Sequence, residues 1–413
     1  MLATTGAVTL ALVSILQLTE ATRIPLTKRD VGIKQADGSI NLAKLKEETS
    51  NLFGKYRRNK QATTNNARKI QGGGAVQELS KRGSIPLTIQ DYAIWTGRLT
   101  IGTPPQPFDI YFDTGSSDFT VASTTCGTSC GSKDRYNPAA STTANTTTTT
   151  ITTNFVDGTS SSGKLVYDTV TAGGLTAKSQ AVIAATSLSS SVSAIASDGM
   201  GLAYPALSQA FSSSLQFTFT NEGQGNVPYF GLRLSNTPGV SAITFSGYNR
   251  LKVAGSIRWF NVVKDGSTVS FNTYWQVGGS APFVNGVQAS NRVNHIFDSG
   301  TTLIIAPQDA ATAFWSKVPN SQVYDDGIWS FPCDATPTVE FSFARITLQK
   351  YGVDPEDFNL GYTPEDPSMC VGAVLGGNLG IGSSWILGDA FLLSHYIIHD
   401  VSSRARIGLA PPR

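Results

Sequence analysis

Short runs of alternating apolar and polar residues make up most of this chain, and the runs end at glycine or proline. A period of two residues is typical of strands that bury one face. The clearest runs lie at residues 92–95, 97–101, 108–112, 226–235, 241–247 and 257–260. One run, at 309–317, has the spacing of a short helix, and no long stretch shows helical periodicity. The pattern predicts an all-β protein.

One motif occurs twice. Residues 112–117 read Phe-Asp-Thr-Gly-Ser-Ser and residues 297–302 read Phe-Asp-Ser-Gly-Thr-Thr, and each copy follows an apolar, strand-like run. The glycine allows a tight turn, and the hydroxyl and amide groups beside it can hold the carboxylate oxygens in a fixed position. A single copy would most often be an ordinary turn, but the pair predicts two related halves. A two-fold axis between them would bring Asp113 and Asp298 face to face.

Each copy is followed, at nearly the same spacing, by a second apolar run that ends at glycine. These runs lie at residues 199–202 and 385–389. Residues 95–106, 201–205 and 386–391 complete the pattern. With these motifs the chain resembles the pepsin-like aspartic endopeptidases of the secreted fungal type, from about residue 83 to the end.

The resemblance implies the bilobal pepsin-like acid protease fold, an all-β fold in which two lobes are related by a pseudo-two-fold axis. The active site would lie in the cleft between the lobes. Residues 83–252 would form the N-terminal lobe with Asp113 and the flap, and residues 253–413 the C-terminal lobe with Asp298.

The resemblance also implies roles within the two loops. Asp113 and Asp298 would be the catalytic pair and would activate a water molecule between them. Thr114 and Ser299 would lock the two loops together. The residues that the resemblance assigns to substrate binding are Gly115, Ser116, Phe155, Val156, Asp157, Gly300, Thr301 and Thr302.

The chain departs from the family pattern at the flap, the hairpin that closes over bound peptide. The family usually has a tyrosine there, and its hydroxyl bonds a tryptophan beyond the first aspartate. Phe155 and Thr120 stand at those two positions. Because both partners of one hydrogen bond are replaced together, no donor is left unpaired, and we expect altered activity rather than its loss. Residues 198–201 are also one residue shorter than the family pattern.

Length and charge suggest a processed precursor. The 413 residues exceed one ordinary core and predict about two domains. The net charge of +2 averages two unlike parts, because residues 22–82 are strongly basic whereas the rest is net acidic. The basic segment has no interleaved aromatic residues, so we do not expect nucleic-acid binding. We expect a pro-segment that charge holds on the acidic body and that acid releases.

Residues 1–21 contain an apolar run followed by a small residue and predict a secretory signal. The run is shorter than the roughly 20 residues that span a membrane, so no membrane anchor is expected. The expected location is outside the cell, with an acidic vacuole as the second choice.

Two dipeptides in the pro-segment bear on its role. Lys81-Arg82 at its end resembles a processing site for a Kex2-type protease, although the enzyme itself could also make this cut. Lys55-Tyr56 resembles the pair that covers the active site in relatives and inhibits them. Lys55-Tyr56 could equally belong to a solvated basic patch at 55–60, and the sequence favours neither reading.

Four cysteines behind a secretory signal predict disulfides, which allow three pairings. The family pattern implies Cys126 with Cys130 and Cys333 with Cys370, one pair in each lobe. A zinc site is not expected, because none of the three histidines stands at ligand spacing to the cysteines.

The sequence also predicts the positions of two further residues. Asn145 is the only glycosylation acceptor, and we expect it on an exposed loop that leads into a strand. His295, three residues before Asp298, is expected on a strand face rather than as a base.

The resemblance implies an aspartic endopeptidase that is made as a zymogen, works without a cofactor or metal, and cuts extended peptides in acid as a monomer. Two other classes compete. Paired carboxylates also hydrolyse glycosides, but that chemistry does not need matched loops on duplicated halves. A pepsin-fold protein that binds peptide without cutting is the stronger rival. Both loops are intact, which favours the enzyme.

Overall fold

The computed structural model describes residues 32–66, 83–86, 88–90, 94–154, 160–189, 198–225, 227–264, 271–343 and 349–413. Three predicted features lie outside the described residues. They are the signal at 1–21, the processing site Lys81-Arg82 and the flap residues Phe155, Val156 and Asp157.

The first half of the body is built on one eight-stranded sheet. Its strands, in spatial order, are β2 (Thr88–Gln90), β3 (Ile94–Ile101), β4 (Gln106–Asp113), β9 (Asp198–Gly201), β5 (Phe119–Ala122), β8 (Leu175–Ser187), β7 (Ser160–Ala172) and β6 (Asn145–Asn154). The separate strands predicted at 92–95 and 97–101 are wrong, because their described residues form the single strand β3. Gly97 does not interrupt β3, since it stays in the ladder opposite Ile110.

The second half is built on two sheets. The larger contains β20 (Tyr351–Gly352), β19 (Val339–Ser342), β13 (Gln276–Val284), β15 (Val293–Phe297), β24 (Trp385–Leu387), β16 (Ile304–Ala306) and β23 (Val374–Gly376), with β14 (Val287–Gln288) beside β13. The smaller contains β17 (Gln322–Asp325), β18 (Ile328–Pro332), β22 (Asp366–Gly372) and β21 (Asn359–Thr363).

The two eight-stranded sheets repeat one arrangement around the two motifs. β4 and β15 lead into the two loops, and they pair in parallel with β9 and β24. The strand after each loop, β5 or β16, pairs antiparallel with that same neighbour. The duplication that the repeated motif predicts is therefore present in the strand pairing.

A six-stranded sheet joins the two halves. Its strands, in order, are β1 (Gly83–Pro86), β11 (Ala242–Phe245), β10 (Tyr229–Arg233), β25 (Tyr396–Asp400), β26 (Arg406–Ala410) and β12 (Arg258–Asn261). The strands predicted at 226–235, 241–247 and 257–260 correspond to β10, β11 and β12. Because this sheet takes strands from both halves, the lobe boundary near residue 252 stays a prediction.

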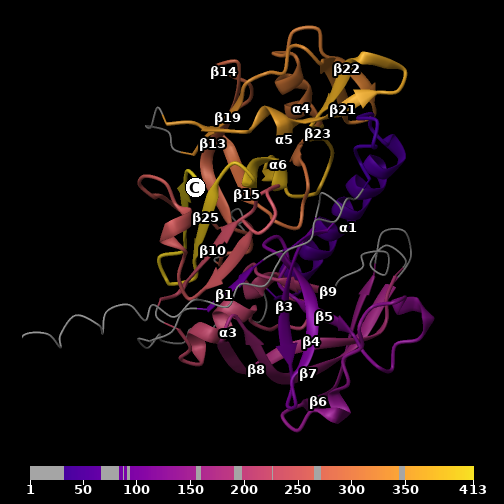
Figure 1. Cartoon of the computed structure of the whole chain (residues 1–413), viewed down its shortest axis with the longest axis vertical. Coiled ribbons are helices and arrows are strands. Elements are labelled where there is room, and N and C mark those ends of the chain that lie inside the picture. Colours follow the sequence, from indigo (N-terminus) through magenta and orange to yellow (C-terminus); the bar gives the residue numbers. More distant parts are fainter. Residues whose placement is uncertain are drawn as a thin grey trace, which may run out of the picture.

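One long helix contradicts the expectation that the chain has none. α1 (Leu42–Asn66) has 25 residues and is about 37 Å long. Its buried residues are Leu45, Leu52, Tyr56, Asn59, Ala62, Thr63 and Asn66. The buried face follows helical spacing, but its second half is mostly polar, so hydrophobic periodicity alone does not reveal it. Figure 1 shows α1 in indigo, running beside both halves.

The other α-helices of the described ranges are short. They are α3 (Leu215–Asn221), α4 (Gln308–Trp315), α5 (Pro355–Phe358) and α6 (Asp389–Leu392). α4 confirms the helix predicted at 309–317, and its Phe314 and Trp315 are buried in the core. Among the described residues, no helix combines the length and the apolar character that a membrane span requires.

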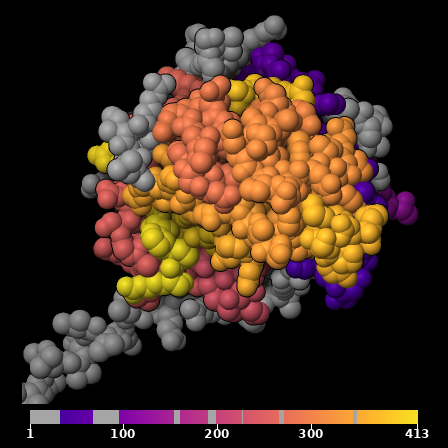
Figure 2. Space-filling view, turned by 90° about the horizontal axis from the view of Figure 1, so that it is seen from above, coloured from indigo at the N-terminus to yellow at the C-terminus, as the bar shows by residue number. Residues whose placement is uncertain are grey.

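Both implied disulfides are present. Cys126 and Cys130 close a small loop after β5, and Cys333 after β18 is bonded to Cys370 of β22. Figure 2 shows the second half of the chain, orange to yellow, covering most of one face of the molecule. Residues of the first described segment, in indigo, lie at the margin of this face.

Candidate active site

Asp113 and Asp298 meet in one buried site between the two halves. Asp113 is the last residue of β4, and Asp298 directly follows β15. Their exposed fractions are only 2% and 0%. Two carboxylic acids in such a place need hydrogen-bond donors around them, because burial without partners is costly.

Each loop holds its carboxylate with one amide and one hydroxyl group. The amide of Gly115 donates to Asp113 Oδ1 (2.8 Å), and the hydroxyl of Ser116 donates to Oδ2 (2.5 Å). In the second loop, the amide of Gly300 donates to the equivalent Oδ1 (2.9 Å), and the hydroxyl of Thr301 donates to Oδ2. These matched bonds fix the plane of each carboxylate.

The two glycines let each loop approach the carboxylate of the other. A Cβ atom on Gly115 would lie 2.4 Å from Asp298 Cγ, and one on Gly300 would lie 2.3 Å from Asp113 Oδ1. Real Cβ atoms do not approach that closely, so only glycine fits at either position.

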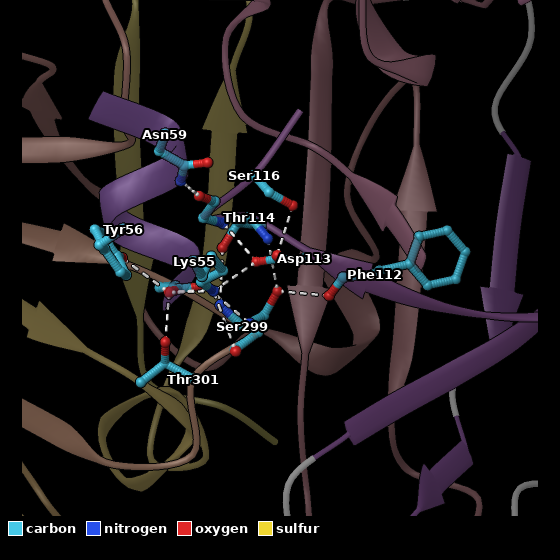
Figure 3. A network of polar contacts seen from close by, with 12 residues as sticks. Lys55, Tyr56, Asn59, Phe112, Asp113, Thr114, Ser116, Ser299 and Thr301 are labelled. Carbon is cyan, nitrogen blue, oxygen red and sulfur yellow. Dashed lines mark hydrogen bonds and ion pairs between the residues drawn. The ribbon is translucent and has the colours of Figure 1, made fainter. Parts of the chain in front are cut away.

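The loops are locked to each other by Thr114 and Ser299. The Thr114 amide donates to Ser299 Oγ (3.1 Å), and the Ser299 amide donates to Thr114 Oγ1 (2.9 Å). Each hydroxyl then donates across the interface, from Thr114 to the carbonyl of Phe297 (3.0 Å) and from Ser299 to the carbonyl of Phe112 (2.8 Å). Figure 3 shows part of this reciprocal network. It positions the two carboxylates relative to each other.

Lys55 and Tyr56 of α1 lie directly on the pair. Lys55 Nζ is 3.2 Å from Asp113 Oδ1 and 2.7 Å from Asp298 Oδ2, and the Tyr56 hydroxyl donates to the same Asp298 oxygen (2.9 Å). The Lys55 side chain is 12% exposed. Of the two readings of this dipeptide, the geometry therefore agrees with the covering pair and not with a solvated patch. Figure 3 shows both side chains reaching from α1 into the site.

Charge and burial shift the pKa values of the two aspartates in opposite directions. Burial raises the pKa of Asp113 to about 6. The charge of Lys55 lowers this pKa, and the charge of Asp298 raises it further. Burial also disfavours ionisation of Asp298, but the charge of Lys55 and hydrogen bonds from Asp113, Lys55 and Thr301 outweigh it and lower the pKa of Asp298. The pKa of Lys55 is raised, because the two carboxylates outweigh its burial. The two carboxyl groups therefore titrate as one coupled pair, in which Asp113 takes up a proton more readily than Asp298.

Side chains of α1 also donate hydrogen bonds to main-chain carbonyls of the two loops. Asn59 Nδ2 donates to the carbonyl of Gly115 (2.7 Å), and Lys55 Nζ donates to the carbonyl of Gly300 (3.1 Å). Sequence reasoning missed Asn59. Its position one helical turn after Lys55 is a usable signal only once a helix is expected there.

Both ends of α1 are attached, one to each half. Lys46 near its start forms an ion pair with Asp325 of β17 (2.6 Å). Asn66 at its end donates to the carbonyls of Ala206 (2.9 Å) and Ser208 (2.8 Å). The helix therefore bridges the two halves across the carboxylates.

Three other predicted residues lie outside this network. The main-chain oxygen of Thr302 accepts from the amide of Ala390 (2.9 Å). Asn145 is exposed, but it is the first residue of β6, so the acceptor begins the strand instead of preceding it on a loop. His295 is fully buried, and burial lowers its pKa to about 3, as expected for a histidine on the inner face of a strand. Within the described ranges, no group of three or more His, Cys, Asp or Glu side chains could hold a metal ion.

Comparison with known proteins adds independent findings. A family model described as eukaryotic aspartyl protease matches residues 94–412. An aspartic protease from Phaffia rhodozyma is 33% identical over 397 residues, which cover 94% of this chain and 90% of that protein. Rhizopuspepsin-1 from Rhizopus niveus is 29% identical over 364 residues, 87% of this chain and 89% of that protein. Pepsin A from Rhinolophus ferrumequinum is 30% identical over 323 residues, 76% and 80% respectively.

Proposed function

Because this chain belongs to the eukaryotic aspartyl protease family and is an aspartic endopeptidase, we propose that Asp113 and Asp298 are its catalytic pair. One observation carries the proposal. Two interlocked loops present two buried carboxylates, each held by one amide and one hydroxyl group, with the glycine of each loop against the carboxylate of the other.

The chemistry follows from a pair that shares one proton. The ionised carboxylate takes a proton from a water molecule while the protonated one donates to the carbonyl oxygen of the substrate. The water oxygen adds to the carbonyl carbon and gives a tetrahedral diol without a covalent enzyme intermediate. The carboxyl that took the proton from water then gives it to the amide nitrogen, and the other carboxylate takes a proton from a hydroxyl of the diol. The C–N bond breaks, a carboxylic acid and an amine leave, and the pair again holds one shared proton.

The contacts of α1 support an inhibitory role for Lys55 and Tyr56 in the zymogen. The ammonium group and the phenol hydroxyl occupy carboxylate oxygens that the reaction needs. The Asn59 side chain donates a hydrogen bond to the carbonyl of Gly115, a residue that the family resemblance assigns to substrate binding. While α1 is bound, neither water nor peptide can reach the pair.

The remaining roles belong to the same proposal. After α1 leaves, an extended peptide would lie along the cleft and pair with main-chain groups of the loops and the flap. Residues 1–21 would direct secretion, cleavage after Lys81-Arg82 would yield a monomeric enzyme of two lobes, and Asn145 would carry a glycan. Secretion is supported by the apolar run at the start of the chain and by the pair of disulfides.

The direct test is cleavage of a denatured protein by the processed enzyme between pH 2.5 and 7, with and without pepstatin. Asp113→Asn and Asp298→Asn serve as the inactive variants. We expect cleavage only in acid, abolished by pepstatin and by either substitution. Cleavage that survives both substitutions would show that another group acts on the peptide bond.

A further inference from the structure

A row of three residues lies on the same sheet face as Asp113. Tyr111 precedes Asp113 by two positions in β4, so both side chains leave the strand on one side. Tyr111 is paired with Gly199 of β9, and Gly199 is paired with Thr120 of β5. All three residues are partly exposed, whereas the next row along these strands, on the opposite face, is buried. The row therefore lies on the sheet face that carries Asp113 and not on the face that packs into the core.

The ring of Tyr111 covers Gly199. A Cβ atom on Gly199 would lie 2.4 Å from Tyr111 Cζ and 2.6 Å from the phenol oxygen, so the far end of the ring lies directly over the glycine. Because β9 lies between β4 and β5, the ring points across the sheet toward Thr120. Tyr111 thus fills the space above two small residues.

Two departures from the family pattern meet at this place. Residues 198–201 are one residue shorter than the pattern, and Thr120 stands where the family usually has tryptophan. The second departure, threonine in place of tryptophan, removes bulk from this face of the sheet. Tyr111 brings an aromatic ring to the same face from a different strand.

Tyr111 also lies close to the groups that α1 brings to the site. Burial raises the pKa of Tyr111 to about 12, and the charge of Asp113 adds to this increase. The positive charges of Lys55 and Arg58 lower the pKa but do not outweigh burial. The phenol is therefore neutral throughout the acid range. The phenol therefore lies within electrostatic reach of both the Asp113 carboxylate and two basic residues of α1.

From this geometry we infer that Tyr111 determines specificity. Its ring narrows the pocket beside Asp113, so that a small side chain such as Ala or Ser next to the scissile bond is accepted better than Phe or Leu. This inference rests on the proposed function and adds the class of substrate to it. An aliphatic residue of smaller volume at position 111 would open the pocket above Gly199 and Thr120.

The test compares processed wild-type enzyme with Tyr111→Val and Tyr111→Phe on peptides that carry Ala, Ser, Leu or Phe on either side of the cut. Tyr111→Val should raise kcat/KM for Leu or Phe relative to Ala by about 10- to 100-fold, the range for a few methylene groups in an apolar pocket. Tyr111→Phe keeps the ring and should keep the wild-type ranking. Tyr167→Val is the control, because Tyr167 is also partly exposed but lies in β7, paired with Asn145 and Ala181.

The outcomes separate this inference from the proposed function. A wild-type enzyme that prefers Phe or Leu beside the cut, or a Tyr111→Val enzyme that cleaves well with the wild-type ranking, overturns the role of Tyr111 alone. No cleavage of any peptide by processed wild-type enzyme overturns both. If Tyr111→Val does not fold, Tyr111→Leu makes the same comparison with a smaller loss of volume.

Discussion

Lys55 Nζ lies between the carboxylates of Asp298 and Asp113, 2.7 Å from Asp298 Oδ2 and 3.2 Å from Asp113 Oδ1. A single ammonium group of α1 thus contacts both carboxylates that we propose as the catalytic pair. Its attraction depends on at least one carboxylate being ionised. The contact that we propose inhibits the zymogen is therefore also a contact that acid weakens.

The first prediction concerns the pH at which α1 is released. The charge and the hydrogen bond of Lys55 lower the pKa of Asp298, so Asp298 binds a proton more tightly in the free site than in the occupied site. The attraction of Lys55 to Asp298 is complete above the ordinary pKa of an aspartate and is lost as pH falls through the lowered value, whereas its attraction to Asp113 weakens already near pH 6. Hydrogen exchange of the α1 amides, measured from pH 6 down to 2.5, should show release only in acid.

Asp298→Asn is the matched variant for this titration. It removes the titrating group but leaves the side chain nearly unchanged in size. Its α1 amides should exchange with much weaker pH dependence. Equal pH profiles in the two zymogens would mean that other groups control release, for example the Lys46–Asp325 pair.

A second prediction concerns the lock between the loops. Ser299→Ala removes one acceptor and one donor from a buried network and leaves the Thr114 amide and the Phe112 carbonyl without those partners. We expect the free energy of unfolding to fall by about 1–3 kcal/mol. We also expect a lower kcat, because the carboxylates lose their fixed separation. Chemical denaturation and peptide hydrolysis measure both, with the exposed Ser316→Ala as control. Unchanged kcat in Ser299→Ala would contradict the positioning role.

A third prediction concerns the glycines beneath the carboxylates. Gly300→Ala places a methyl group 2.3 Å from Asp113 Oδ1. Because this distance is too short, the carboxylates must move apart. Activity should fall below a hundredth of wild type, while the chain still folds, since the strain is confined to the loop. Gly127→Ala, at a position with open space, should behave as wild type in the same hydrolysis assay. Near-normal activity of Gly300→Ala would show that the loops are less tightly packed.

A fourth prediction concerns the buried histidines. Burial lowers the pKa of His295 and His399 to about 3 and that of His395 to about 4. Protons therefore bind the unfolded chain more tightly, and stability falls as pH drops from the ordinary histidine value toward these lowered values. His399→Leu should show a smaller decrease in Tm between pH 6.5 and 4 than wild type. Identical decreases would show that His399 does not contribute.

Sequence reasoning reached the catalytic loops because their chemistry is local. An aspartate, a glycine and hydroxyl residues within six positions show what each loop can do, and their repetition shows that the loops belong together. The disulfide pairs followed from the family resemblance. In contrast, the sequence left Lys55 between two readings, because a charged run looks the same whether it faces solvent or a carboxylate.

The long helix and the role of Tyr111 were out of reach for a different reason. Asn59 and Asn66 are buried on α1 only because loop carbonyls of the body accept their hydrogen bonds, so no apolar pattern marks that face. Tyr111 covers Gly199 only because β4 and β9 pair in one particular register. Both features depend on partners that are distant in sequence.

The most direct test of the account is peptide hydrolysis by uncut zymogens at pH 5, with Arg82→Ser present in every variant to prevent processing. Lys55→Met removes the ammonium group from the catalytic pair, and Lys46→Met removes only the more exposed pair with Asp325. We predict that Lys55→Met hydrolyses peptide at least tenfold faster than the parent zymogen, whereas Lys46→Met changes the rate little. A Lys55→Met zymogen as inactive as its parent, although both become active once α1 is removed, would contradict the claim that Lys55 blocks the pair.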